Sequence, residues 1–242
     1  MPRGRSPGYE LQRETILARA AELFAQRGYT ATSMNEVAEA CGVSKPSLYH
    51  YVRDKHQLLA EIAEAHVARL LALVAQVDAA NPAPEQRLRL LIDAFLAAYA
   101  GSQAEHRVLT EDVRFLAPPE KARVLDGQRR VVAAFATAIV AIRPELASAR
   151  LDKPMAMLLF GMMNWMFTWL QPQGTLSHAD LAPVVADLFF GGVGAVRAPL
   201  PKISNHINGD SPCPSQETPS SPPPSRRRPR SPTSRTPTSP SA

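Results

Sequence analysis

Segments of helical periodicity, separated by Gly and Pro, follow one another along most of this 242-residue chain. Between Leu11 and Arg27, for example, apolar residues recur three and four positions apart, as they do on one face of a helix. No segment alternates apolar and polar residues as a half-buried strand does. Aromatic residues make up only 6% of the chain, and Ala, Leu and Val supply most of the apolar content. The sequence therefore predicts an all-α fold of about nine helices, at 11–27, 33–42, 44–52, 54–79, 85–100, 103–115, 119–142, 152–170 and 178–197.

Capping signals mark the starts of several of these helices. Ser33 and Glu36 have the spacing of a capping box, and Gly42 is expected to end the helix that they begin. Ser44 is an N-cap candidate, followed by Pro46 in the first turn, where its missing N–H has no cost. Two similar pairs, Asp54 with Gln57 and Ser177 with Asp180, precede the fourth and the last helix.

The sequence divides into four parts: a flexible basic arm at 1–10, a domain of short helices at 11–55, a larger helical domain at 56–198 and a tail at 199–242. The tail holds 12 of the 23 prolines and much Ser and Arg, so we expect it to be disordered. The net charge of +5 is concentrated at the two ends. Basic ends suit a polyanionic partner, although on charge alone a solvated surface explains them equally well.

Three short helices within about forty residues, with only Gly42-Val43 between the second and the third, indicate a helix-turn-helix whose third helix reads the major groove. Its apolar side chains are expected to face inward, and its polar ones to be left for the groove. The inward set is Val37, Ala38, Cys41, Val43, Leu48 and Val52, and the outward set is Lys45, Ser47, Tyr49, His50 and Tyr51.

The stretch Arg13–Leu59 resembles the N-terminal domain of TetR-type repressors. The matching run includes Ile16-Leu17, Gly28-Tyr29, Thr32-Ser33-Met34 and Gly42 to Val52, and its spacing holds without a gap. The resemblance implies that Thr32 and Ser33 bind phosphate at the start of the second helix. It also implies groove contacts by Lys45, Pro46 and Ser47, phosphate contacts by Tyr49 and Lys55, base or phosphate contacts by His50 and Tyr51, and a palindromic double-stranded operator bound by a homodimer.

The segment Met155–Leu170 is apolar on nearly every side and contains five of the seven methionines. Such a helix has to be buried on all faces, which one chain of this size can hardly provide. Two interpretations stay open for Met162, Met163, Trp165, Met166 and Trp169: the core of a dimer, as the family resemblance implies for its last two helices, or the lining of an effector pocket.

The run from Gly161 to Pro172, with Gly174 and Leu176-Ser177, resembles the C-terminal domain of TetR-type regulators of lipid and sterol breakdown, several of which sense acyl-CoA thioesters. It implies an apolar small-molecule effector, with an acyl-CoA as a candidate. Six basic residues would then be available for CoA phosphates, or are simply solvated: Arg107, Arg114, Lys121, Arg123, Arg129 and Arg130.

Other classes of function find little support. We see no catalytic motif, cofactor fingerprint or metal-ligand spacing, and the two cysteines, Cys41 and Cys213, suggest no disulfide framework. Met155–Leu170 is too short to cross a bilayer and no signal peptide is recognised, so we expect a cytoplasmic protein without a cofactor or membrane contact. The sequence favours a ligand-released repressor. A constitutive DNA-binding protein without an effector is the alternative, and activation is not excluded.

Overall fold

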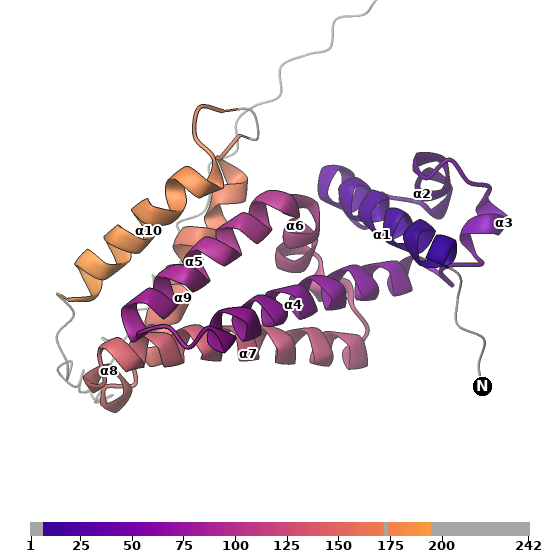
Figure 1. The fold of residues 1–242 in the computed structure, drawn as a ribbon. Helices are drawn as coiled ribbons and strands as arrows, with labels where there is room; N and C mark the ends of the chain where they lie inside the picture. Colours follow the sequence, from indigo (N-terminus) through magenta and orange to yellow (C-terminus); the bar gives the residue numbers. More distant parts are fainter. Residues whose placement is uncertain (1–6, 172–173, 195–242) are drawn as a thin grey trace, which may run out of the picture. The chain divides into compact units, whose positions relative to one another are not determined.

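The computed structural model describes residues 7–171 and 174–194, and these residues contain helices and no strand (Figure 1). The predicted arm at 1–6, the end of the last predicted helix at 195–198 and the tail at 199–242 lie outside the described residues. The α-helices are α1 (Pro7–Arg27), α2 (Met34–Ala40), α3 (Lys45–Leu48), α4 (Lys55–Ala79), α5 (Pro84–Gly101), α6 (Gln103–Glu111), α7 (Pro118–Ile142), α8 (Glu145–Ser148), α9 (Asp152–Asn164) and α10 (His178–Val193), with 3₁₀ turns η1 (Val113–Phe115) and η2 (Trp165–Thr168).

The all-α prediction is confirmed, with differences at particular boundaries. Residues 7–10, expected in the arm, belong to α1, since Pro7 is well suited to the first turn of a helix. The reader helix α3 has only four residues. The apolar segment expected as one helix over 152–170 ends at Asn164 and tightens into η2. The one-turn helix α8 follows Arg143-Pro144, where only a break was predicted.

The predicted caps are present at the starts of α2, α3 and α10. At α2 the Glu36 backbone N–H donates to Ser33 Oγ, and the Ser33 N–H donates to the Glu36 carboxylate at 2.8 Å. The pair at α4 is only half a capping box. Asp54 accepts from the Gln57 N–H at 2.8 Å, but the Gln57 amide oxygen accepts from the backbone of Arg53, at 2.7 Å, rather than from that of Asp54.

The described residues fall within one compact unit, in which α4 is the common element (Figure 1). Its start contacts α1, and its remaining length packs against α5, α6 and α7. α4 and α7 approach closely at Gly127, where an added Cβ would lie 2.2 Å from Val67 Cγ1. α10 covers α5, while α9 packs on α7. α1 also contacts α6, so the helix-turn-helix is joined to the larger helical part through two helices.

Among the described residues, none of the helices combines the length and apolar character needed to cross a membrane.

Candidate nucleic-acid interface and ligand pocket

The turn between α2 and α3 is set by Gly42, whose φ is +64°. The Val43 N–H donates to the Ala38 carbonyl and the Gly42 N–H to the Glu39 carbonyl, both at 3.0 Å. This is the Schellman arrangement, in which a left-handed residue closes the helix. A side chain at position 42 would be strained there. The predicted helix-turn-helix therefore has a tightly defined turn.

Buried apolar side chains hold α3 against α2. Val37, Ala38, Leu48 and Val52 are all buried, as expected of the inward set. Cys41 and Val43 are only partly buried but pack against the same core. Because Leu48 is fully enclosed, the opposite side of this short helix has to face outward.

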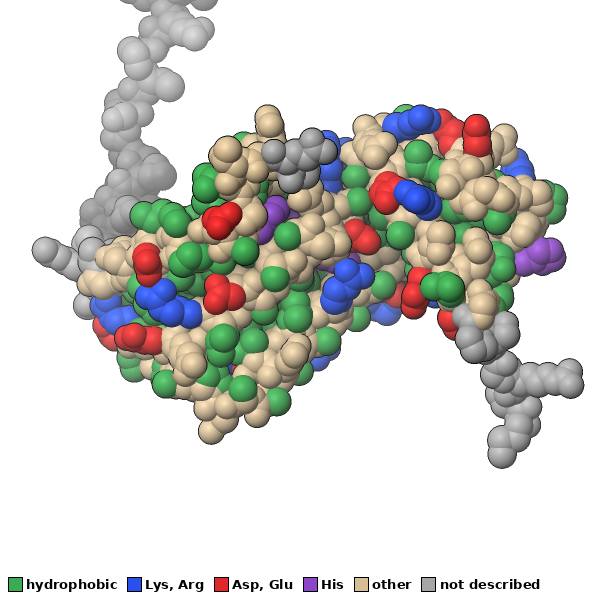
Figure 2. Space-filling view, turned by 45° about the horizontal axis from the view of Figure 1, so that its top comes forward, with side chains coloured by type: hydrophobic (Ala, Val, Ile, Leu, Met, Phe, Trp, Pro, Cys, Tyr) green, Lys and Arg blue, Asp and Glu red, His purple; other side chains and the backbone are tan. Residues whose placement is uncertain are grey.

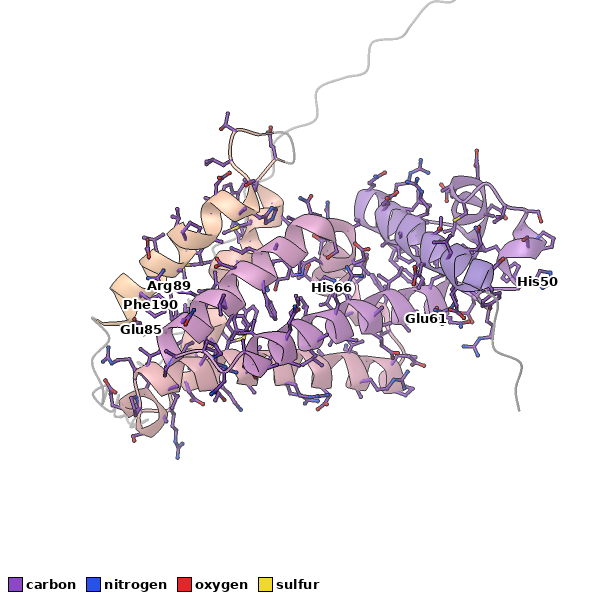
Figure 3. All side chains as sticks on the ribbon, in the orientation of Figure 1. His50, Glu61, His66, Glu85, Arg89 and Phe190 are labelled. Atoms are coloured by element: carbon purple, nitrogen blue, oxygen red, sulfur yellow. The ribbon has the colours of Figure 1, made fainter. Side chains whose placement is uncertain are left out.

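The outward side carries the predicted groove residues. Lys45, Pro46, Tyr49 and His50 are exposed, and Tyr49 keeps 44% of its surface accessible. Figure 3 shows His50 at the tip of the domain, pointing away from the rest of the molecule. Ser47 is half-buried, and its backbone N–H donates to the Ser44 N-cap. These side chains form one polar surface around the first turn of α3 and the residues after it.

Lys55 differs from the prediction of a phosphate contact. Its ammonium donates to the carbonyl oxygens of Tyr29, Thr30 and Thr32, at 2.9, 3.3 and 2.7 Å, and lies 4.5 Å from the centroid of the Tyr29 ring. An ammonium has three hydrogens, and all three have partners within the protein. Lys55 therefore fastens the α1–α2 loop to the start of α4 in this structure, and its phosphate contact stays a prediction.

The expected phosphate site at the start of α2 is also largely occupied. Thr32 is 1% exposed and its hydroxyl donates to the Gly28 carbonyl, so its side chain faces the interior in this structure and its phosphate contact stays a prediction. Ser33 is exposed, but its hydroxyl donates to Glu36. The bonds from Ser33 hold the pKa of Glu36 below its usual value, which places a carboxylate where a phosphate was expected.

Tyr51 is half-buried rather than fully outward, because its ring stacks on Tyr9 with centroids 4.8 Å apart. The Tyr9 hydroxyl donates to the His50 carbonyl at 3.3 Å. Tyr9 thus braces the residues that follow α3 from the first turn of α1. Sequence reasoning missed this residue because it placed Tyr9 in the arm.

A pocket of about 760 Å³ lies in the larger helical part, between α4, α5, α6, α7 and α9. Its apolar wall includes Val67, Leu70, Leu109 and Phe160, and its residues from α9 are Lys153, Met157, Phe160 and Asn164. Tyr99, His106 and Thr110 add polar groups, and Arg129, Arg130 and Lys153 bring positive charge. Of the six basic residues proposed for CoA phosphates, only Arg129 and Arg130 line it.

The predicted pocket residues from the methionine-rich segment lie elsewhere. Met163 and Met166 are buried in the chain's own core and Met162 packs partly against it, while Trp165 and Trp169 are 66% and 52% exposed. None of the five lines this pocket, because the side of α9 that faces it carries Met157, Phe160 and Asn164 instead. Their role, in a dimer core or near an effector, stays a prediction.

Large hydrophobic side chains are exposed along α9, η2 and α10 and in the residues that connect η2 to α10. Apart from Met157, which lines the pocket, those with about half or more of their surface exposed are Leu158, Trp165, Trp169, Leu176, Val184 and Leu188. Figure 2 shows hydrophobic side chains exposed on both halves of the visible surface, including the half away from the helix-turn-helix. We call this set the apolar face. Exposed apolar residues in such a number are typical of a protein–protein contact.

Two buried histidines meet beside the pocket, His66 from α4 and His106 from α6 (Figure 3 labels His66). His66 Nε2 and His106 Nδ1 are 3.4 Å apart, and the Tyr99 ring stacks on His106 at 3.8 Å. Burial lowers the pKa of His66 to about 4 and that of His106 to about 3, so both rings are neutral at pH 7.

A helix-turn-helix joined by one long helix to a larger helical domain is the architecture of a DNA-binding transcription regulator. Residues 16–62 match the family model described as bacterial regulatory proteins, tetR family, and residues 81–193 match that of the tetracyclin repressor-like C-terminal domain. The chain therefore belongs to the TetR family of transcription regulators.

Individual relatives agree with this assignment. The chain is 33% identical over 113 residues to the HTH-type transcriptional activator FasR of Mycolicibacterium smegmatis, covering 47% of this chain and 52% of FasR. It spans about half the length of the curated relatives that it matches. A TetR-family regulator from Bordetella parapertussis has 34% identity and a TM-score of 0.72, over 77% of this chain and 98% of that one. The fold is also shared, at 24% identity and a TM-score of 0.61, with AibR in complex with isovaleryl coenzyme A and operator DNA, over 73% and 97%.

Proposed function

We propose that this protein is a ligand-released repressor that binds a palindromic operator as a homodimer in the cytoplasm. The observation that carries the proposal is the polar surface at α3. Lys45, Pro46, Tyr49 and His50 are exposed on a helix whose other side is locked by the buried Leu48. A major groove about 12 Å wide accepts one helix presented in this way. Ser47 and Tyr51 contribute at the margins of this surface. The exposed Ser33 contacts a DNA phosphate once its hydroxyl exchanges its bond to the Glu36 carboxylate for one to the phosphate.

The apolar face supports the homodimer. Trp165, Trp169 and Leu188 gain most by burial, since a fully buried side chain of this kind contributes about 2 kcal/mol or more. In a dimer with a two-fold axis through this face, the apolar face of one chain packs against the same face of the second chain. Two reader helices about 34 Å apart then enter successive major grooves, which accounts for a palindromic operator.

The pocket supports an effector, against the alternative of a constitutive DNA-binding protein. Its volume of about 760 Å³ is within the range of small-molecule sites. The structure of AibR, which shares this fold, is a complex with isovaleryl coenzyme A. We extend an acyl-CoA to this chain as the effector candidate, with Arg129, Arg130 and Lys153 near its phosphates. Arg129 also lies 3.5 Å from the carboxylate of Asp126, which lines the pocket too. Arg107 and Arg123 lie outside the pocket lining and are paired with Glu111 and Glu64.

An electrophoretic mobility shift tests the proposal. The probe is the DNA upstream of the protein's own gene, with and without a series of acyl-CoAs. We expect a protein–DNA complex of reduced mobility, which some of the acyl-CoAs dissociate. Failure to bind any palindrome near the gene contradicts the DNA-binding assignment, while binding that no effector changes favours the constitutive alternative. A promoter fusion then distinguishes repression from the activation named for FasR.

A further inference from the structure

Among the described residues, two buried polar atoms of the pocket lining have no hydrogen-bond partner: His106 Nε2 and Asn164 Oδ1. A third, Nδ1 of His66, belongs to the ring beside the pocket. His106 is 3% exposed. Unpaired buried polar atoms are uncommon because each loses its hydration without replacement. A chain that keeps two of them at one cavity is expected to use them when the cavity is filled.

The two residues reach the pocket from different helices, α6 and α9, and both line it. Phe167, three residues after Asn164, lies edge-on to the His106 ring with centroids 6.2 Å apart, so the end of α9 adjoins α6 here. Tyr99 stacks on His106, and His66 occupies its Nδ1. The ring is therefore held on two sides, and Nε2 is its remaining polar atom.

The chemistry of this end of the pocket is polar but uncharged. Both imidazoles are neutral, because burial depresses their pKa values. A ligand carboxylate placed between them would lose its hydration without gaining a counter-ion. A neutral oxygen has no such penalty. Around it, Val67, Leu70 and Leu109 offer only apolar contact.

We propose that His106 Nε2 and Asn164 Oδ1 recognise a neutral hydroxyl or carbonyl group on an otherwise apolar effector. When His66 Nε2–H donates to His106 Nδ1, the neutral His106 ring carries its own proton on Nε2. A hydroxyl then pairs with both atoms, with the amide as oriented, by accepting from His106 Nε2–H and donating to Asn164 Oδ1. A carbonyl, such as that of a ketone or an acyl thioester, is bound by His106 Nε2–H and by the amide N–H₂ of Asn164 after a flip of its side chain. This inference rests on the proposed effector function and specifies its chemistry.

The test uses four probes of equal chain length: 2-undecanol, 2-undecanone, undecanoate and undecane. Their binding to the full chain is measured by the shift in melting temperature, and by calorimetry for the soluble probes. We expect the alcohol or the ketone to bind at least about tenfold more tightly than undecanoate. Which of the two binds better identifies the oxygen group. Equal binding of undecane or undecanoate overturns the proposal.

Variants assign the recognition to the two residues. His106→Phe and Asn164→Leu should each weaken binding of the preferred probe about tenfold, while Gln76→Leu, which removes an exposed amide on α4, should leave it unchanged. Asn164→Leu removes an unpaired acceptor, so the ligand-free variant should melt no lower than the wild type, which separates lost recognition from misfolding. Wild-type affinity in Asn164→Leu overturns the assignment.

The same preparations are examined for operator binding, so that the two proposals fail separately. DNA binding without binding of any probe overturns the pocket inference and leaves the regulator in place. Binding of the alcohol or ketone probe without any operator binding overturns the proposed regulator function and leaves the pocket inference in place.

Discussion

The rings of Tyr29 and Phe115 lie 5.3 Å apart and nearly parallel, with an interplanar angle of 28°. Tyr29 belongs to the α1–α2 loop of the helix-turn-helix, whereas Phe115 ends η1, directly after the pocket helix α6. The Tyr29 hydroxyl also bonds to His56 Nδ1 at 3.0 Å, at the start of α4. This contact is a short physical link between the DNA-binding helices and the helix that carries His106.

The contact should transmit the effector's influence. We predict that Phe115→Ala leaves operator affinity within about threefold of wild type. The effector should dissociate the variant from the operator less effectively, because the ring of η1 that stacks on Tyr29 is lost. The measurement is operator affinity as a function of effector concentration. Undiminished release would show that coupling runs through other contacts, such as the Arg13–Glu61 ion pair at 2.7 Å.

Tyr49→Ala should weaken operator binding about tenfold or more while leaving the dimer intact. The exposed phenol is assigned to the DNA backbone and lies far in sequence from the apolar face. Fluorescence anisotropy measures the DNA affinity, and light scattering measures the mass. Loss of dimerisation in this variant would mean that α3 is not the helix that contacts the major groove.

Lys55 and Lys45 should behave differently, although both are lysines of the same small domain. Lys55→Met is expected to lower the free energy of unfolding by about 1–3 kcal/mol, because three carbonyl oxygens lose a charged donor. Lys45→Met should leave stability nearly unchanged and reduce the salt dependence of DNA binding. Denaturant titration and salt-dependent binding measure the two effects. A stable Lys55→Met protein whose DNA binding depends less on salt would instead support the phosphate contact predicted for Lys55.

Trp165→Glu should convert the dimer to a monomer and thereby reduce operator binding. A carboxylate on the apolar face would be buried without a partner in the dimer. Leu11→Glu is the matched control, since Leu11 is 67% exposed on α1, away from that face. Sedimentation velocity reports the mass. A dimeric Trp165→Glu protein would place the interface elsewhere.

Stability should fall as the pH drops below 6.5. The folded-state pKa values of His66 and His106 are lowered to about 4 and about 3, so only the unfolded chain takes up their protons between pH 6.5 and about 4. In this range each histidine lowers the free energy of unfolding by about 1.4 kcal/mol for each unit that the pH falls. Carboxylates with lowered pKa values, such as Asp54, add to the loss only nearer pH 4.

Urea titrations at several pH values measure this dependence. The double variant His66→Phe/His106→Phe should show a much flatter profile between pH 6.5 and 4.5. An unchanged slope in that variant would place the titrating groups elsewhere.

The helix-turn-helix could be predicted almost completely because its signals are local. The capping box of Ser33 and Glu36 and the turn at Gly42 each depend on residues within a few positions of one another. The roles of Lys55 and Thr32 could not be predicted in this way. A lysine at a helix start looks the same in sequence whether it binds a phosphate or three carbonyls of a loop more than twenty residues away.

The pocket escaped prediction for a related reason. Helical periodicity shows which residues of α9 are apolar, but α9 is apolar on several sides, and periodicity does not show which side faces α6 and α7. Only the packed structure assigns Phe160 and Asn164 to the pocket and Trp165 to the surface. The His66–His106 pair joins residues forty positions apart, and no local pattern marks such a contact.

The three hydrogen bonds that Lys55 donates to the α1–α2 loop determine which substitutions this loop tolerates. Lys55 holds the α1–α2 loop through main-chain oxygens, which every amino acid supplies. The exposed side chains at positions 30 and 31 can therefore vary without loosening the loop, whereas the lysine itself has no substitute that offers three donors from one atom. The α1–α2 loop is thus anchored through its main chain, so the amino acids exposed on its surface can differ between related proteins without altering how α2 and α3 are held.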